Sequence, residues 1–241
     1  MPEPLFQRGS TYQQHRPSYP DSLFLWLAQQ CPERARALDL GCGTGQACRG
    51  LEPWFKQVIG ADLSLPQLLA APTSQTHYLA SSASSLPLAD DSLNLITVAQ
   101  AFHWFDQPRF FAEAQRCLRS GGLLALVSYG LCEVDGLRPL IRDYHNGALG
   151  PWWPKERATL LANYPDATLP WARVLHPGDF LECQWRVADM LGYLDTWSAL
   201  VRARKAGEDP LATLRPVLTE AWGPAPRTVR WPLRVKAWRR P

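Results

Sequence analysis

The chain has 241 residues, of which 46% are hydrophobic and 20% are charged, and its formal net charge is +3. This is enough for one substantial hydrophobic core, so we expect a single domain overall. No stretch of the sequence approaches the ~20 consecutive apolar residues that a membrane-spanning helix needs. The first residues are polar and unlike a signal peptide. We therefore expect a cytoplasmic protein with no membrane partner.

The cysteines of the chain indicate neither a disulfide framework nor a metal site. No two of them form a C-x-x-C pair, and none clusters with a histidine. We expect no metal, and thiols that stay reduced in a cytoplasm. The six are Cys31, Cys42, Cys48, Cys117, Cys132 and Cys183.

Apolar and amphipathic segments alternate through the first half of the chain. After a helix at 22–30, which Asp21 is placed to cap, strands are expected at 35–40, 57–61, 77–80, 95–99 and 123–128. Helices are expected between them at 44–53, 65–71 and 107–119, with Ser64 as the cap of the second. Strands that alternate with helices predict an α/β fold with a doubly wound, parallel sheet.

This alternation ends near residue 130. The segment 131–178 is rich in Pro and Trp, with short helices expected at 137–146 and 156–162, and we interpret it as a cap insertion that binds an acceptor. Beyond it we expect a strand at 180–185, helices at 188–201 and 211–222, and a last strand at 228–238. The predicted organisation is an N-terminal lid and first helix (1–30), a Rossmann-like core (31–130), the cap (131–178) and a segment that completes the sheet (179–241).

Three alternating glycines follow the first predicted strand. Asp39 lies just before Gly41, Gly43 and Gly45, with a helix expected to follow. A dinucleotide loop has the pattern G-x-G-x-x-G, whereas here the third glycine comes one residue early. An acid in front of the loop would repel a pyrophosphate but would attract the cationic end of an amino acid. Both departures favour S-adenosylmethionine over NAD.

The second predicted strand also ends in an acid. Asp62 lies 17 residues beyond Gly45, where its carboxylate can accept hydrogen bonds from both hydroxyls of a ribose. The two strand ends together predict a site for an adenosine-containing ligand.

Several further segments carry a family resemblance. VIGADLS at 58–64, the segments at 86–88 and 90–95, and CLRSGG at 117–122 resemble the successive motifs of class I S-adenosylmethionine-dependent methyltransferases. More narrowly, Tyr12, RPSYP at 16–20 and QAFHWFD at 100–106 resemble the trans-aconitate methyltransferase subgroup. The resemblance is dense over residues 6–130. It implies S-adenosylmethionine as methyl donor and a seven-stranded sheet whose last strand is antiparallel.

The resemblance assigns donor-site roles to particular residues. The glycine loop would carry the amino-acid portion of the donor, Asp39 would lie near its ammonium group, and Asp62 would hold the ribose. The adenine would lie against Leu63 and near the loop after the third strand, where Ser82 stands at a position that is often acidic. The expected donor-binding residues are Asp39, Gly41, Cys42, Gly43, Thr44, Gly45, Asp62, Leu63, Ser82, Ala83 and Gln100.

Acceptor-site expectations rest on four residues, His103, Trp104, Tyr12 and Arg16. His103 either orients the acceptor or acts as its base, or it is a packed histidine that holds its loop. Trp104 would form pocket wall. By resemblance, the segment with Tyr12 and Arg16 folds over the donor, so that Tyr12 approaches the sulfonium and Arg16 anchors a carboxylate. Further candidates in the cap are Trp152, Trp153 and Arg157.

Charge is unevenly distributed, with a net −1 over residues 1–130 and +4 over 131–241. Arginine with aromatic residues suits nucleic acid or planar carboxylates, and a third interpretation is that this composition simply reflects codon bias. No N-P-P-Y-like tetrapeptide follows the fourth strand, and we expect no nucleic-acid partner. We expect methyl transfer to a small molecule, with a carboxylate of an organic acid as acceptor, by a monomer or homodimer. The alternatives are a nucleic-acid or protein methyltransferase and a non-catalytic protein that binds S-adenosylmethionine.

Overall fold

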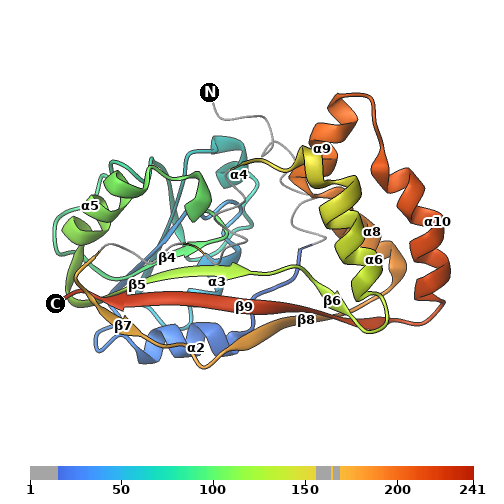
Figure 1. Ribbon diagram of the computed structural model, residues 1–241. Helices are drawn as coiled ribbons and strands as arrows, with labels where there is room; N and C mark the ends of the chain where they lie inside the picture. The colour runs from blue at the N-terminus through green and yellow to red at the C-terminus, as the bar shows by residue number, and fades with distance from the viewer. Residues whose placement is uncertain (1–15, 156–163, 165–168) are drawn as a thin grey trace.

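The computed structural model describes residues 16–155, 164 and 169–241, and a β-sheet lies at its centre (Figure 1). The first five strands run parallel in the order β3-β2-β1-β4-β5, and β9 is antiparallel to β5. In chain order the strands are β1 (Arg36–Leu40), β2 (Gln57–Asp62), β3 (His77–Ala80), β4 (Leu93–Ala99), β5 (Leu118–Tyr129), β6 (Glu133–Val134), β7 (Ala172–Val174), β8 (Asp179–Trp185) and β9 (Arg227–Arg239).

The nine described strands occupy seven positions across the sheet. β5 and β6 pair along one edge of β9, and β7 and β8 pair along the opposite edge. At Val229, for example, Val134 of β6 and Cys183 of β8 are both partners, one on each side. The predicted seven-stranded, mostly parallel sheet with an antiparallel last strand is therefore confirmed.

Helices cover both faces of this sheet, as the apolar pattern requires. α2 (Asp21–Gln29) and α3 (Gln46–Leu51) bury their apolar side chains on one face, and α5 (Gln107–Cys117) buries Phe110 and Ala114 on the other. The short helices α4 (Leu65–Leu69) and η2 (Phe102–Trp104) follow β2 and β4. The inner strands β1 and β4 are buried almost throughout, as is typical of parallel strands covered on both sides.

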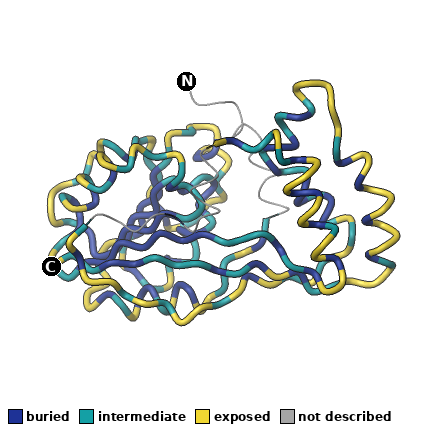
Figure 2. Tube along the Cα trace, in the orientation of Figure 1, coloured by how far each residue is buried: buried dark blue, intermediate teal, exposed yellow. Residues whose placement is uncertain are grey.

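A helical lobe stands beside the sheet (Figure 1). It contains α6 (Arg138–Asp143), the short π-helix η3 (Tyr144–Ala148), η4 (Gly150–Trp152), α8 (Val187–Asp195), α9 (Ser198–Lys205) and α10 (Pro210–Trp222). Figure 2 shows exposed residues along α9 and α10, whereas the inner strands of the sheet are mostly buried. The lobe is larger than the expected cap at 131–178, because three helices that follow β8 join it. The expected helix at 156–162 lies outside the described residues.

The helix expected at 188–201 is broken into α8 and α9. Thr196 closes α8, and the backbone of Trp197 is extended, with φ −72° and ψ 131°. The indole of Trp197 is only 2% exposed and packs against the rings of Tyr193 and Trp153. A residue-by-residue helical pattern does not reveal this break, since the contact of Trp197 with Trp153 joins segments 44 residues apart.

Asp21 and Asn94 are polar residues at the starts of α2 and β4, and their roles differ. α2 begins at Asp21 itself, with Pro20 in the N-cap position, so Asp21 contributes its charge to the first turn and is not the cap that we expected. Asn94 at the start of β4 accepts the backbone N–H groups of Ala35 and Arg36 at 3.1 and 2.9 Å. An amide oxygen is sufficient for this structural role.

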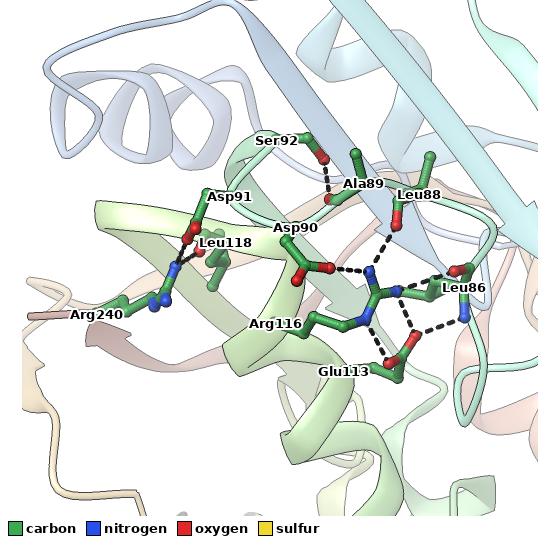
Figure 3. A network of polar contacts seen from close by, with 10 residues as sticks. All are labelled: Leu86, Leu88, Ala89, Asp90, Asp91, Ser92, Glu113, Arg116, Leu118 and Arg240. Atoms are coloured by element: carbon green, nitrogen blue, oxygen red, sulfur yellow. Dashed lines mark hydrogen bonds and ion pairs between the residues drawn. The ribbon is translucent and has the colours of Figure 1, made fainter.

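Arg116 of α5 holds the loop between β3 and β4 (Figure 3). Its guanidinium donates to the carbonyl oxygens of Leu86 and Leu88 at 3.0 and 2.7 Å and pairs with Asp90 at 2.7 Å and with Glu113 at 2.8 Å. Glu113 also accepts the N–H of Leu86 at 2.6 Å. The guanidinium of Arg116 lowers the pKa of Glu113. The network fixes the loop that begins at the carboxyl end of β3.

None of the helices within the described ranges combines the length and apolar character needed to cross a lipid bilayer.

Candidate functional site

A cavity of about 900 Å³ opens at the carboxyl ends of the parallel strands. Residues from the ends of β1, β2 and β4 line it. The strand order reverses between β1 and β4, and an open α/β sheet binds ligands at such a switch point because its loops diverge there. The site therefore lies where the glycine loop and Asp62 were expected to meet.

The glycine loop adopts the left-handed conformation at all three glycines, with φ +71° at Gly41, +56° at Gly43 and +73° at Gly45. This region is costly for residues with a Cβ. Space is also limited, since a Cβ on Gly41 would collide with Ala101 and one on Gly45 with the Tyr78 side chain. Gly41 and Gly43 line the cavity, with Cys42 and Thr44. Gly45 is not among the lining residues, and its close approach to Tyr78 accounts for the glycine.

Asp62 ties the second strand to the glycine loop. Its Oδ2 accepts the backbone N–H of Gly43 at 2.8 Å, and its Oδ1 accepts that of Ser64 at 2.8 Å. A carboxylate offers about four acceptor positions, so two remain for ligand hydroxyls. The side chain lines the cavity. Its orientation is thus fixed before any ligand arrives.

Asp39 is 1% exposed and borders the same cavity. Its carboxylate accepts the hydroxyl of Thr97 at 2.9 Å and the thiol of Cys48 at 3.6 Å. Burial raises the pKa of Asp39 to about 7, although the hydrogen bonds from Thr97 and Cys48 oppose this shift. The negative charge of Asp39 is therefore easily lost near neutral pH, and a nearby cation would favour its ionised form.

Leu63, Ser82 and Ala83, which we expected to contact adenine, line the cavity. Leu63 is 68% exposed, which leaves its side chain available to cover a flat ring. The hydroxyl of Ser82 accepts the backbone N–H of Ser84 at 3.1 Å, and its own proton can still be donated. Ala83 is buried.

Arg16 lines the cavity beside the helical lobe. Its Nη1 donates to the Tyr129 hydroxyl at 3.2 Å, and its Nη2 donates to the Thr196 carbonyl at 3.5 Å. The guanidinium also lies 5.3 Å from the centre of the Tyr193 ring. The residue is thus built into the cavity wall. Tyr12 and Arg157 lie outside the described residues.

His103 and Trp104 differ in position although they are neighbours. Trp104 lines the cavity and is 40% exposed at its rim. His103 does not belong to the described lining, and its Nδ1 lies 3.3 Å from the hydroxyl of Tyr164, a residue that is 2% exposed. The imidazole therefore packs against Tyr164 and supports the turn that presents Trp104.

Gln100 occupies a strained position at the end of β4. Its φ is +57°, which is uncommon for a residue with a side chain. Its backbone N–H donates to Val127 at 2.9 Å, and its side-chain amide donates to the Tyr129 carbonyl at 3.5 Å. These bonds hold Gln100 against β5, where it lines the cavity.

Comparisons with known proteins fit this geometry. Residues 38–126 match the family model described as a methyltransferase domain. The chain is 34% identical over 221 residues to a protein of Dictyostelium discoideum named as a methyltransferase, an alignment that covers 89% of this chain and 84% of that protein. The present chain belongs to the class I S-adenosylmethionine-dependent methyltransferases.

Two further relatives of this methyltransferase extend the comparison. A solved structure described as a type II methyltransferase from Anaeromyxobacter dehalogenans has a TM-score of 0.85 and 38% identity, and the match covers 93% of this chain and 97% of that one. A malonyl-[acyl-carrier protein] O-methyltransferase of Dechloromonas aromatica is 31% identical over 184 residues, or 65% of this chain and 70% of that protein.

The residues of the methyltransferase cavity fit the donor that the family uses. S-Adenosylmethionine has a ribose that would suit the two unused acceptor positions of Asp62 and an ammonium group that would suit Asp39. The backbone N–H groups of Gly41, Cys42, Gly43 and Gly45 are already bonded within the protein.

Sequence reasoning missed several residues of this methyltransferase site. Gln46 lines the cavity and donates to the Pro17 carbonyl at 3.0 Å, which ties the N-terminal segment to the glycine loop. Gln67 of α4 is 6% exposed and lies beside Gly43. Tyr129 ends β5, seven residues beyond the motif at 117–122, and Arg202 lies in α9, outside the segments that carry the resemblance. Only Gln46 had a local signal, its place directly after the third glycine.

Proposed function

We propose that this methyltransferase esterifies a carboxylate of a small organic acid. The observation that carries the proposal is the position of Arg16 in the cavity wall, oriented by Tyr129 and Thr196. A guanidinium recognises planar anions such as carboxylates through a fork of N–H donors. Arg16 lines the cavity, so an acceptor bound there would lie beside it.

The chemistry of a carboxylate acceptor agrees with the lining of the cavity. An oxygen lone pair of the acceptor forms the bond to the methyl carbon, the carbon–sulfur bond breaks, and its electron pair returns to sulfur. No proton moves, because a carboxylate is already ionised near pH 7. Of the described lining residues, none is a histidine. The protein would act mainly by positioning, which can contribute ~7 to 11 kcal/mol.

Two resemblances also support an acid acceptor. The relative from Dechloromonas aromatica is named as an O-methyltransferase of a malonyl group, which carries a free carboxylate. The segments at 16–20 and 100–106 resemble the trans-aconitate methyltransferase subgroup, as described above.

The arginines of the basic second half are compatible with a nucleic-acid acceptor, but several of them bond to other parts of the protein. Arg227 donates to three backbone carbonyls, and Arg239 donates to those of Gln30 and Gly121. Arg230 pairs with Glu182 at 2.7 Å. The tryptophans beyond residue 150 are buried or half-buried, so their faces are not displayed for base stacking. These arginines and tryptophans therefore stabilise the fold.

The test is a screen of small acids, amines and alcohols for release of S-adenosylhomocysteine. The expected product is a methyl ester, which mild base cleaves to methanol and the parent acid. A product that resists base, such as a methylamine or methyl ether, would contradict the proposal. Donor binding without turnover on any acceptor would instead favour the non-catalytic alternative. A gel shift with RNA or DNA at sub-micromolar protein would favour a nucleic-acid acceptor.

A further inference from the structure

Gln67 is a buried polar residue in the wall of the cavity. It belongs to the short helix α4, is only 6% exposed and lines the cavity at the ends of the strands. Its backbone N–H donates to the Ser64 carbonyl at 3.0 Å, whereas its side-chain amide makes no hydrogen bond within the ranges that the structure describes. An amide that is removed from water without a partner costs free energy. A ligand in the cavity can supply that partner.

The position of this amide is set by the same contacts that orient Asp62. The Oδ1 atom of Asp62 accepts the backbone N–H of Ser64 at 2.8 Å, and Ser64 immediately precedes α4. Its Oδ2 atom accepts the N–H of Gly43 at 2.8 Å. The amide of Gln67 lies against that glycine, because a Cβ on Gly43 would stand 3.5 Å from the Oε1 of Gln67. The carboxylate and the amide therefore both lie next to Gly43, and both residues line the cavity.

A carboxylate and an amide offer complementary hydrogen bonds to a sugar hydroxyl. An ionised carboxylate can only accept, so a ribose bound to Asp62 would give it the protons of its hydroxyls. Each hydroxyl oxygen then keeps lone pairs that need a donor. The N–H groups of Gly43 and Ser64 already bond to Asp62. The amide of Gln67 has two N–H donors, and rotation about χ3 can turn them toward the ribose.

We propose that the side-chain amide of Gln67 donates a hydrogen bond to a hydroxyl oxygen of the donor ribose, which makes Gln67 a determinant of donor affinity and of ribose recognition. The proposal concerns the donor half of the site, so it does not depend on which acceptor is methylated. It rests on the expected place of the ribose at Asp62. Because S-adenosylhomocysteine carries the same ribose as the methyl donor, binding without turnover tests it.

The experiment measures the affinities of four ligands by calorimetry at pH 8. They are S-adenosylhomocysteine, its 2′-deoxy and 3′-deoxy analogues, and 5′-methylthioadenosine, which keeps the ribose but lacks the amino-acid portion. The proteins are wild type, Gln67→Met, Gln67→Glu and the control Gln115→Met. Methionine keeps the length of the side chain and its packing without an N–H group, and glutamate keeps the shape but exchanges the donors for an acceptor.

Gln115 provides the matched control. It is an exposed glutamine of α5 and does not belong to the described lining of the cavity. The variant Gln115→Met therefore makes the same chemical change on a helix away from the ligand. Each variant is first shown to melt like wild type.

We expect Gln67→Met to weaken the binding of S-adenosylhomocysteine about 2- to 10-fold, the value of one neutral hydrogen bond. The loss for 5′-methylthioadenosine should be the same. Wild type and Gln67→Met should bind equally the deoxy analogue that lacks the bonded hydroxyl, because the partner of the amide is then absent from both complexes. Gln67→Glu should lose at least as much affinity as Gln67→Met, and Gln115→Met should match wild type.

Unchanged affinity for S-adenosylhomocysteine in a folded Gln67→Met protein would overturn the proposal. An equal loss with both deoxy analogues would mean that the amide contacts neither hydroxyl, and a loss that disappears with 5′-methylthioadenosine would assign the amide to the amino-acid portion of the donor. Deoxy analogues that bind wild type as tightly as S-adenosylhomocysteine would remove the ribose from Asp62 and reject the proposal with it. If Gln67→Met does not fold, Gln67→Glu carries the same comparison.

Discussion

The carboxylate of Asp62 lies 2.8 Å from the backbone nitrogen of Gly43 and accepts its hydrogen bond. This contact joins the end of β2 to the glycine loop that follows β1, across 19 residues of sequence. One side chain thereby fixes the loop that would carry the amino-acid portion of the donor and presents the remaining acceptor positions to the ribose. Asp62 therefore links the glycine loop to the expected ribose position.

Replacing Asp62 should therefore weaken donor binding more than the loss of ribose contacts alone would. Each charge-assisted hydrogen bond is worth ~1.5 to 3 kcal/mol, and Asp62→Ala also releases the N–H of Gly43. We expect at least a 100-fold loss of affinity for S-adenosylhomocysteine by calorimetry, with Asp62→Asn intermediate because it keeps one acceptor oxygen. Unchanged affinity in a folded Asp62→Ala protein would remove this residue from the donor site.

Asp39 should make donor affinity depend on pH. Its folded-state pKa of about 7 lies above the ordinary 3.8, so between about pH 4 and 7 the folded apo-protein holds a proton that the unfolded chain releases. Its contribution to the free energy of unfolding therefore falls as pH rises through that window. Donor binding has the opposite sign, since an ammonium group favours the ionised carboxylate.

We expect affinity for S-adenosylhomocysteine to fall about tenfold from pH 8 to pH 6, as the ionised fraction of Asp39 falls. Asp39→Asn is the control, because the amino group of the ligand titrates equally with both proteins. If the two proteins show the same pH dependence, Asp39 does not face the ammonium group.

The sequence predicts the donor half of the site better than the acceptor half, for a physical reason. The glycine loop and Asp62 each end a strand, and parallel strands bring their carboxyl ends together whatever the rest of the chain does. Arg202, Tyr129 and Gln67 reach the cavity only through the packing of separate helices and strands. Trp197, at the break that precedes α9, packs against Trp153, which lies 44 residues earlier in the chain, and no local pattern encodes that contact.

Gly45 should be essential for stability and not for ligand contact. Alanine there would hold an unfavourable φ of +73° and would drive its Cβ into the Tyr78 side chain. The backbone conformation alone costs roughly 1 to 2 kcal/mol, so we expect Gly45→Ala to lower the free energy of unfolding in urea by more than 2 kcal/mol. Adding Tyr78→Phe removes the nearest clashing atom and should recover part of that loss. Additive effects of the two changes would contradict the contact.

Arg116 should stabilise the loop between β3 and β4 (Figure 3). Arg116→Ala leaves Glu113, whose side chain is only 16% exposed, without its cation and frees two backbone carbonyls. We expect a loss of about 1 to 3 kcal/mol in the free energy of unfolding. Arg109→Ala on the same helix is the control, because its pair with Asp106 is 3.6 Å long and exposed, and such pairs contribute under about 1 kcal/mol. Equal losses in the two variants would show that the network of Figure 3 stabilises the protein no more than an exposed ion pair does.

Variants of His103 and Trp104 should distinguish a packing role from a catalytic role. His103→Phe keeps a ring beside Tyr164 and removes both ring nitrogens, so we expect kcat within a few-fold of wild type and the same pH–rate profile. Trp104→Ala removes an exposed wall of the cavity and should raise the acceptor KM while donor affinity stays unchanged. A general base contributes about 100- to 10,000-fold to rate. A loss of that size in a folded His103→Phe protein with normal donor affinity would make His103 the base. Because a carboxylate needs no base, the acceptor would then be a hydroxyl or an amine.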